Sequence, residues 1–378
     1  MPPNHSVRIL IVDDSAVTRS LLRAVVASDA ALEVVGVAGD GQTALARMES
    51  LKPDIVLLDV EMPVMDGLST LKQLRARGHR MPVIMCSSLT QRGGRVTIEA
   101  LSCGASDYVA KPSGQSGPAA ALKVLSQELL PKIHALARTV MVPQSIAPPP
   151  TRQSAILPPV AVLATAPPPP VKGTPSIVVI GVSTGDPAAL DEVLPAIPAN
   201  FPLPIVIVQH MPEMFTQLLA EHLNNRCALH VCEAAEGVSL VHGSAYIARG
   251  NWHLEIAPDR HSRMPKAHLT QAAPENHCRP AADVLFRTAV HAFGAEVLAV
   301  VLTGMGSDGL EGSRLIRASG GNVIVQDRPT SAVWGMPGAV ANAGLATSVL
   351  PLPEIAPEIL KLCGYTKTTA RQLRETVA

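Results

Sequence analysis

The sequence predicts an α/β protein with two doubly wound parallel-sheet domains. Short apolar runs rich in β-branched residues alternate with helical segments along most of the chain, and one proline-rich stretch interrupts this alternation. The length of 378 residues suits two or three domains of ordinary size. We expect a first domain over residues 7–125, a terminal helix and linker over 126–175, a second domain over 176–364, and a polar tail over 365–378.

The composition excludes several classes of partner. Thirty-one basic residues balance 31 acidic ones, so the net charge gives no reason to expect nucleic acid or an anionic membrane surface. We find no secretory signal pattern and no apolar run near the ~20 residues that span a bilayer. The 6 cysteines lack Cys-x-x-Cys spacing, which favours free thiols in a reducing compartment. We therefore expect a cytoplasmic protein without direct membrane insertion.

The first domain is predicted to contain five strand–helix units. In a doubly wound sheet, ligands bind at the carboxyl ends of the strands, so polar residues that follow strands are the candidates for a site. The predicted strands are Val7–Val12, Leu32–Ala38, Ile55–Leu58, Val83–Cys86 and Ala105–Val109. The predicted helices are Ala16–Ser28, Gly41–Ser50, Gly67–Gly78, Arg95–Cys103 and Ala119–Ala137.

Polar side chains follow four of these strands: Asp13, Asp14, Asp59, Ser87 and Lys111. Each alone is explained equally well as a helix cap, a turn residue or a solvated charge. Together they are hard to assign to capping, because clustered carboxylates repel unless a cation or a reaction uses them. Oxygen ligands favour Mg²⁺, with Asp13, Asp14 and Asp59 holding the metal. Asp59 would accept a phosphoryl group, Ser87 would donate to its oxygens, and Lys111 would be the charge partner.

These residues lie in three segments with the sequences VDDS (12–15), LDVEMPVMDG (58–67) and GASDYVAKP (104–112). On these motifs, residues 7–125 resemble the receiver domain of two-component response regulators, which has a flavodoxin-like fold. The resemblance implies Mg²⁺ as the cofactor of phosphorylation and a histidine kinase as phosphodonor. It also implies that Tyr108 is an aromatic switch that responds to Ser87, and that the Lys111–Pro112 peptide bond is cis.

Residues 139–175 differ in composition, with proline runs among Ala, Val and Thr. Polyproline-rich segments stay extended and semi-rigid instead of packing into a core. We interpret this stretch as a linker between two globular parts, with a ligand for SH3-type domains as the less favoured alternative.

The second domain again alternates. The predicted strands are Ile177–Ile180, Ile205–Gln209, Leu229–Cys232, Ala245–Ala248, Val297–Thr303, Asn322–Val325 and Ala346–Val349, with short strands and a hairpin between Tyr246 and Thr270. The predicted helices are Pro187–Leu194, Met214–Asn224, Ala281–Phe293, Leu310–Ala318 and Pro337–Ala343.

The first strand of this domain ends in the sequence GVSTG (181–185). A Gly-x-Ser-x-Gly corner between a strand and a helix exposes the serine hydroxyl, and the helix N-terminus suits a developing oxyanion. Such a loop is also common as a simple turn or a phosphate cradle. Ser183 is therefore a candidate nucleophile that needs partners.

Two further strand ends supply candidate partners, His210 and Asp308. Serine as nucleophile, histidine as general base and aspartate holding the imidazolium is an arrangement that activates a hydroxyl at neutral pH. The chain order Ser, His, Asp differs from that of the α/β-hydrolases. Glycines around Met305 allow its backbone N–H to face the site as an oxyanion-hole donor. The remaining histidines lack zinc-site spacing, so we expect no cofactor in this domain.

Residues 176–362 resemble the catalytic domain of the chemotaxis protein-glutamate methylesterase (CheB) family, a Rossmann-like α/β domain. The motifs are GVSTG (181–185), QHMP (209–212), RPAADVLF (279–286), LTGMGSDG (302–309) and VWGMPGAV (333–340). The resemblance implies a Ser183–His210–Asp308 triad, with Thr184 and Met305 shaping the site around the substrate carbonyl. The chain departs from the family pattern at Asp186, where glycine is usual, and at Arg249, where proline is frequent.

The resemblance implies a hydrolase that demethylates glutamate methyl esters on methyl-accepting chemoreceptors and is activated by phosphorylation of its receiver domain. Deamidation of glutamine is a candidate second activity, because both reactions pass through the same tetrahedral intermediate. The alternative from a different class is a phosphorylation-controlled scaffold or binding protein with a catalytically weakened hydrolase domain. A serine peptidase or general esterase is the third interpretation.

Overall fold

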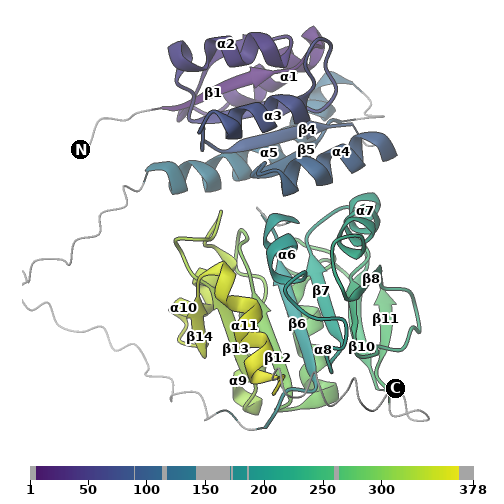
Figure 1. Cartoon of the computed structure of the whole chain (residues 1–378). Helices are drawn as coiled ribbons and strands as arrows, with labels where there is room; N and C mark the ends of the chain where they lie inside the picture. Colours follow the sequence, from purple (N-terminus) through teal and green to yellow (C-terminus); the bar gives the residue numbers. More distant parts are fainter. Residues whose placement is uncertain are drawn as a thin grey trace, which may run out of the picture.

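The computed structural model describes residues 6–88, 90–112, 117–141, 171, 173–184, 187–258 and 264–365. Within these residues the chain forms two parallel sheets, each flanked by helices, in two domains (Figure 1). The predicted fold class is therefore confirmed. The proline runs of the predicted linker and residues 366–378 of the predicted tail lie outside the described residues.

The first domain holds a 5-stranded sheet with strand order β2-β1-β3-β4-β5. All of its pairings are parallel. Its strands are β1 (Val7–Val12), β2 (Leu32–Ala38), β3 (Ile55–Asp59), β4 (Val83–Ser87) and β5 (Asp107–Ala110). Its helices are α1 (Ala16–Ala27), α2 (Gly41–Leu51), α3 (Gly67–Ala76), α4 (Gln91–Ser102) and α5 (Pro118–Met141).

Alternation along β1 shows how this sheet is covered on both faces. Leu10 and Val12 belong to one apolar cluster together with side chains of α2, α3 and α4. Ile9 and Ile11 belong to another, together with side chains of α1 and α5. Because successive strand residues point to opposite faces, an uninterrupted apolar strand is the pattern of a sheet buried on both sides.

The second domain holds a 7-stranded parallel sheet with strand order β14-β13-β12-β6-β7-β9-β8. Its strands are β6 (Ile177–Val182), β7 (Ile205–Gln209), β8 (His230–Glu233), β9 (Ser244–Ile247), β12 (Val297–Val301), β13 (Asn322–Gln326) and β14 (Ser348–Leu350). A separate antiparallel pair consists of β10 (His253–Ala257) and β11 (Lys266–Thr270). The helices are α6 (Pro187–Val193), α7 (Glu213–Asn224), α8 (Ala282–Phe293), α9 (Leu310–Ser319), α10 (Met336–Asn342) and α11 (Leu352–Leu362).

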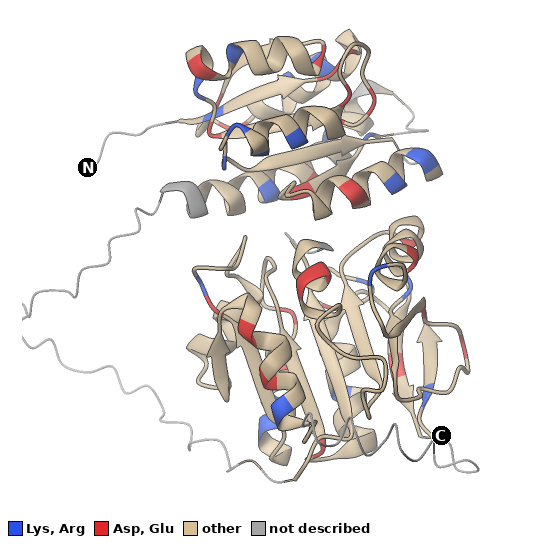
Figure 2. Ribbon diagram, viewed as in Figure 1, with Lys and Arg blue, Asp and Glu red and all other residues tan. Residues whose placement is uncertain are grey.

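The strand order places a topological switch point at β6. From β6 the chain first builds outward through β7, and later returns to add β12 on the other side. Ligands of doubly wound sheets bind outside the carboxyl ends of the strands at such a point. The loops that follow β6, β7 and β12 therefore meet at one edge. Charged residues lie mainly on helices and loops, and the strands contain few of them (Figure 2).

The sequence predicted some elements imperfectly. Helix α11 was not predicted, because Pro353 and Pro357 both fall inside it and proline usually marks a helix end. Helix α4 begins four residues before the predicted Arg95, where the Thr90 side chain accepts a hydrogen bond from Gly93 N and caps the helix. The prediction of a cis Lys111–Pro112 bond is wrong: among the described residues, the cis bond joins Arg279 and Pro280.

The two domains contact each other through α4 and the adjoining end of the first sheet. Helix α4 packs against α7 and α6 of the second domain, as Figure 1 shows. The Tyr108 ring stacks on the Phe215 ring with centroids 4.6 Å apart. At the rim, Arg95 pairs with Glu221 at 2.9 Å. An aromatic pair inside an apolar contact, with an exposed ion pair at its edge, is the usual arrangement of a specific interface.

A second contact lies over the loops that follow β12. Val333 is the second-domain member of the apolar cluster that otherwise consists of first-domain side chains, including several on α5. Met305 packs against this same cluster. The first domain therefore touches the loop that carries a predicted site residue.

We predict that Phe215→Ala loosens the contact between the domains. The Phe215 ring is fully buried, and losing a buried phenylalanine costs about 3–5 kcal/mol, here partly from the stack on Tyr108. Small-angle X-ray scattering should show a larger radius of gyration than for the unchanged protein. Phe201→Ala is the matched control, because Phe201 is buried in the second domain without a ring contact to Tyr108. Equal radii for the two variants would contradict the prediction.

Candidate active site

Ser183 lies directly after β6 and is fixed by its backbone. Its N–H donates to Thr303 O at 3.1 Å, and its carbonyl accepts from Gln209 Nε2 at 2.9 Å. These bonds come from the strands on either side of β6. Gly304 approaches so closely that a Cβ at this position would lie 2.7 Å from Ser183 Cβ. A glycine is therefore required beside the serine.

His210 follows β7, and both of its ring nitrogens have partners. Nε2 lies 2.7 Å from Asp308 Oδ2. Because a carboxylate only accepts hydrogen bonds, Nε2 carries a proton. Nδ1 lies 3.6 Å from Cys278 Sγ. Burial lowers the pKa of His210, but the hydrogen bonds with Asp308 and Cys278 outweigh it and raise the pKa from 6.5 to about 9.

Asp308 is a buried carboxylate surrounded by donors. Besides His210, its oxygens accept from Ala282 N at 2.6 Å, Asp283 N at 3.0 Å and Asn276 Nδ2 at 2.9 Å. The two amides belong to the first turn of α8, where the helix dipole favours a negative charge. Burial acts to raise the pKa of Asp308, yet these hydrogen bonds, above all that from His210, hold it below its ordinary value. Asp308 is therefore ionised and oriented toward the imidazole.

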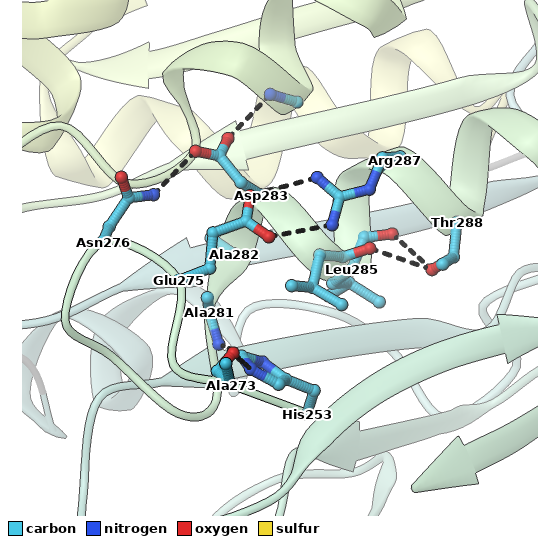
Figure 3. Close-up of polar contacts among 12 residues, drawn as sticks. His253, Ala273, Glu275, Asn276, Ala281, Ala282, Asp283, Leu285, Arg287 and Thr288 are labelled. Carbon is cyan, nitrogen blue, oxygen red and sulfur yellow. Dashed lines mark hydrogen bonds and ion pairs between the residues drawn. The ribbon is translucent and has the colours of Figure 1, made fainter. Parts of the chain in front are cut away.

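Asn276 links Asp308 to a second carboxylate. Its amide nitrogen donates to Asp283 Oδ2 at 2.9 Å (Figure 3). The same nitrogen donates to Asp308 Oδ1 at 2.9 Å. Burial raises the pKa of Asp283 to about 6, against the lowering effect of its hydrogen bond from Gly312 N. The neighbouring Glu275 pairs with Arg287 on α8 through two hydrogen bonds (Figure 3). The turn that carries Asn276 is thereby attached to α8.

The structure brings His210 and Asp308 together as predicted and places both beside the loop of Ser183. Between the described side chains of Ser183 and His210, no hydrogen bond is present. Thr184 is buried, and its carbonyl accepts from Thr303 Oγ1 at 3.0 Å. Met305 is half-buried in the loop after β12. The catalytic roles of these residues stay predictions.

The chain departs from the family pattern at Asp186 and Arg249, and the structure describes the second of these. Asp186 lies outside the described residues. Arg249 forms an ion pair with Glu213 at the start of α7, and its guanidinium lies 5.9 Å from the Trp252 ring centroid. The Glu213 carboxylate thus balances the positive charge of Arg249, which stands where proline is frequent in the family.

Sequence reasoning missed the residues around Asp308. Asn276 and Cys278 received no role, although both stand just before the RPAADVLF motif. The available signal was the Asn-His pair at 276–277, since Asn favours the left-handed backbone of a tight turn. Such a turn in front of α8 would have pointed to the site.

The acidic site of the first domain also assembles as predicted. Carboxylate oxygens of Asp13, Asp14 and Asp59 lie within 4.8 Å of one another. Lys111 Nζ lies 2.8 Å from Asp13 and 2.7 Å from Asp59. Burial, together with the charge of Asp13, raises the pKa of Asp59 to about 6 against the lowering effect of Lys111. Closely spaced carboxylate oxygens that carry negative charge are suitable ligands for a magnesium ion.

Ser87 connects this site to the domain contact. Its hydroxyl lies 2.8 Å from Thr97 Oγ1 on α4, the helix that packs against α7. Tyr108 is buried, with Lys132 Nζ 4.8 Å from its ring centroid on one side and Phe215 as its stacking partner. Both predicted switch residues therefore touch elements at the interface.

Comparison with known proteins decides the family. A model of the CheB methylesterase family matches residues 178–359, and one of the response regulator receiver domain matches residues 9–123. The protein-glutamate methylesterase/protein-glutamine glutaminase of a Nocardioides species is 46% identical, covering 94% of this chain and 95% of its own length. This chain belongs to the CheB methylesterase family.

A second curated relative matches nearly the whole length of this chain, and a solved structure matches half of it. The protein-glutamate methylesterase/protein-glutamine glutaminase of Trichodesmium erythraeum is 44% identical, covering 94% of this chain and 99% of its own. The crystal structure of the Thermotoga maritima CheB methylesterase catalytic domain aligns with 50% of this chain and all of its own, at 40% identity and a TM-score of 0.49. Among the described helices, none has both the length and the apolar character needed to cross a membrane.

We predict that Asn276→Ala lowers kcat for ester hydrolysis about 10-fold, because a buried carboxylate that loses one partner costs roughly 1–3 kcal/mol. Steady-state kinetics of methanol release would measure this. Asn276→Asp should be worse, since it sets a third carboxylate between Asp283 and Asp308. Gln73→Ala is the control, because the Gln73 amide oxygen accepts from Arg77 in the first domain. Full activity in Asn276→Asp would contradict the positioning role.

We predict that activity increases with pH up to about 9. A general base works in its neutral form, and the pKa of His210 is raised to about 9, so the imidazole is protonated over most of the neutral range. The profile of kcat/KM against pH should climb about tenfold per unit below that value and then level. A plateau already reached at pH 7 would show that the base titrates lower.

Proposed function

We propose that this chain is a response-regulator hydrolase that demethylates glutamate methyl esters on chemoreceptors and also deamidates glutamine at such sites. The observation that carries the proposal is the hydrogen-bonded His210–Asp308 pair beside the Ser183 corner, in a chain of the CheB family. The names of the relatives, which give both activities, support the substrate class. The receiver-type acidic site in the same chain supports control by phosphorylation.

The proposed reaction proceeds through an acyl-enzyme. Ser183 Oγ attacks the ester carbonyl while His210 Nδ1 takes its proton, because Nε2 is held by Asp308. The tetrahedral oxyanion is stabilised by the Met305 N–H, with Thr184 shaping the same wall. The C–O bond then breaks, and the imidazolium gives its proton to the leaving methanol. Water, activated by the same imidazole, hydrolyses the acyl-enzyme to glutamate.

The receiver site would bind Mg²⁺ through Asp13, Asp14 and Asp59. A metal held there would supply charge neutralisation for the transfer of a phosphoryl group from the histidine kinase to Asp59. Lys111, which already touches Asp13 and Asp59, pairs with the added negative charge.

Control of the esterase would run through the domain contact. A phosphoryl group on Asp59 draws the Ser87 hydroxyl toward it and away from Thr97 on α4. Since α4 packs on α7 and Tyr108 stacks on Phe215, this change weakens the docked arrangement. A ligand that binds one of two arrangements better shifts the population toward it. Phosphorylation would therefore open the edge where Ser183 lies.

The proposal also includes the cellular location and the domain division. The chain would act in the cytoplasm, where kinase and receptor signalling domains meet it. We propose a division of the chain into segments 7–125, 126–175, 176–364 and 365–378. The ranges matched by the two family models, 9–123 and 178–359, support this division.

We predict that Ser183→Ala lowers methanol release from methylated chemoreceptors by roughly 10⁴-fold or more, as removal of a nucleophile does in serine hydrolases. Acetyl phosphate with Mg²⁺ should increase release by the unchanged protein and leave Asp59→Asn at its basal rate. Methanol would be measured by gas chromatography. Equal release by Ser183→Ala and the unchanged protein would rule out the enzyme and favour a scaffold. Turnover of unrelated peptides would indicate a general peptidase.

A further inference from the structure

Cys278 is a half-buried thiol whose sulfur contacts the imidazole of the proposed base. Its Sγ lies 3.6 Å from His210 Nδ1, while Asp308 holds Nε2 at 2.7 Å. Cys278 is unpaired with any other cysteine. Cysteine, histidine and aspartate therefore form a continuous hydrogen-bonded chain beside the serine.

A tight turn fixes the position of this thiol. Glu275 and Cys278 exchange backbone hydrogen bonds, with Cys278 N to Glu275 O at 2.9 Å and Glu275 N to Cys278 O at 3.1 Å. The two central residues, Asn276 and His277, have φ values of 53° and 64°, which suit a two-residue hairpin turn. Side-chain bonds from Glu275 to Arg287 and from Asn276 to Asp308 attach this turn at two further points. The thiol is thus aimed at the imidazole by the same turn that orients Asp308.

The contact occupies the nitrogen that the serine needs. Because Nε2 is engaged with Asp308, only Nδ1 is left to take the proton of Ser183. The hydrogen bond between Sγ and Nδ1 holds one proton between the two atoms, nearer to one or to the other. In both placements the lone pair of Nδ1 is in use. This agrees with the lack of a hydrogen bond between the described Ser183 and His210 side chains.

We propose that Cys278 is a positioning residue that holds the base nitrogen of His210 in the resting enzyme. The inference rests on the proposed function, since it takes Ser183 as nucleophile and His210 as base. When a haloacetamide alkylates Cys278, the sulfur forms a bond to carbon, the carbon–halogen bond breaks, halide leaves, and the proton held between Sγ and Nδ1 stays on His210. The modified sulfur then blocks access of the serine to its base.

The groups that face the imidazole set the expected pH response. Asp308 lies on one side, with Asp283 and Glu275 behind it, and Cys278 lies on the other. Asp308 is held by Ala282 N, Asp283 N and Asn276 Nδ2, none of which depends on the Cys278 side chain. Removing the thiol therefore removes one of the two side-chain partners that raise the pKa of His210.

The first test compares Cys278→Ala with Cys232→Ala in the full chain, using methanol release from methylated chemoreceptors between pH 6 and 10. Cys232 is a half-buried thiol on β8 and serves as the control. Cys278→Ala should shift the kcat/KM profile about one unit to lower pH and raise activity at pH 7 by roughly 3- to 10-fold. Cys232→Ala should match the unchanged protein. An unshifted profile for Cys278→Ala would overturn the proposal.

The second test measures alkylation of Cys278 by iodoacetamide at pH 7, quantified by mass spectrometry of the 278-containing peptide. His210→Gln should slow the reaction about 10-fold, because the thiolate is the reacting species and the base that forms it is gone. Ser183→Ala should react as fast as the unchanged protein. Equal rates in His210→Gln and the unchanged protein would overturn the proposal. This readout needs no ester hydrolysis, so absent methanol release would refute the proposed function and leave the Cys278–His210 pair to be decided separately.

Discussion

The hydrogen-bonded pair of His210 and Asp308 is the interaction on which the arrangement of the catalytic domain depends. A buried carboxylate is costly unless donors surround it. Those donors come from the end of β7, from the first turn of α8, and from the turn at 275–278. Segments separated by about a hundred residues are therefore held at one point. Because the buried Asp308 carboxylate is costly without these donors, the segments that supply them are held in specific relative positions.

The active site and the domain contact share one loop. Gly304 presses against Ser183, and the adjacent Met305 packs on the apolar cluster of the receiver domain. On the other side, α6 follows the serine corner and packs against α4. A receiver domain that moves as a unit thus changes the surroundings of Ser183 from two directions. No long-range pathway through the sheet is needed to explain control, because the regulated elements touch the regulating domain directly.

Much of the fold and part of the site could be predicted because the carboxyl ends of parallel strands all lie at one edge of the sheet. Residues that follow strands, such as Asp13, Asp59, Ser183 and His210, come to the carboxyl edge whatever the details of packing. Asn276 and Cys278 follow no strand of the main sheet and reach the site through a tight turn. Their direction depends on φ values at 276 and 277 that a sequence pattern only suggests. Helix α11 was missed for a similar reason, since Pro353 lies in its first turn, where proline is favoured, but Pro357 lies inside the helix, where proline is usually unfavourable.

The orientation of the imidazole follows from where the predicted triad residues stand in the sheet. The predicted acid, Asp308, follows β12 and the predicted base, His210, follows β7, so they approach from opposite sides of β6, which the predicted nucleophile follows. Asp308 reaches Nε2, and the serine side of the ring is left with Nδ1. In the Ser-His-Asp arrangement of other serine hydrolases the two nitrogens have the reverse roles. Nδ1 is therefore the nitrogen that both Ser183 and Cys278 would use, and in this structure its partner is Cys278. Under the proposed function, the Gly-Val-Ser-Thr-Gly corner gains its base only when the thiol leaves Nδ1.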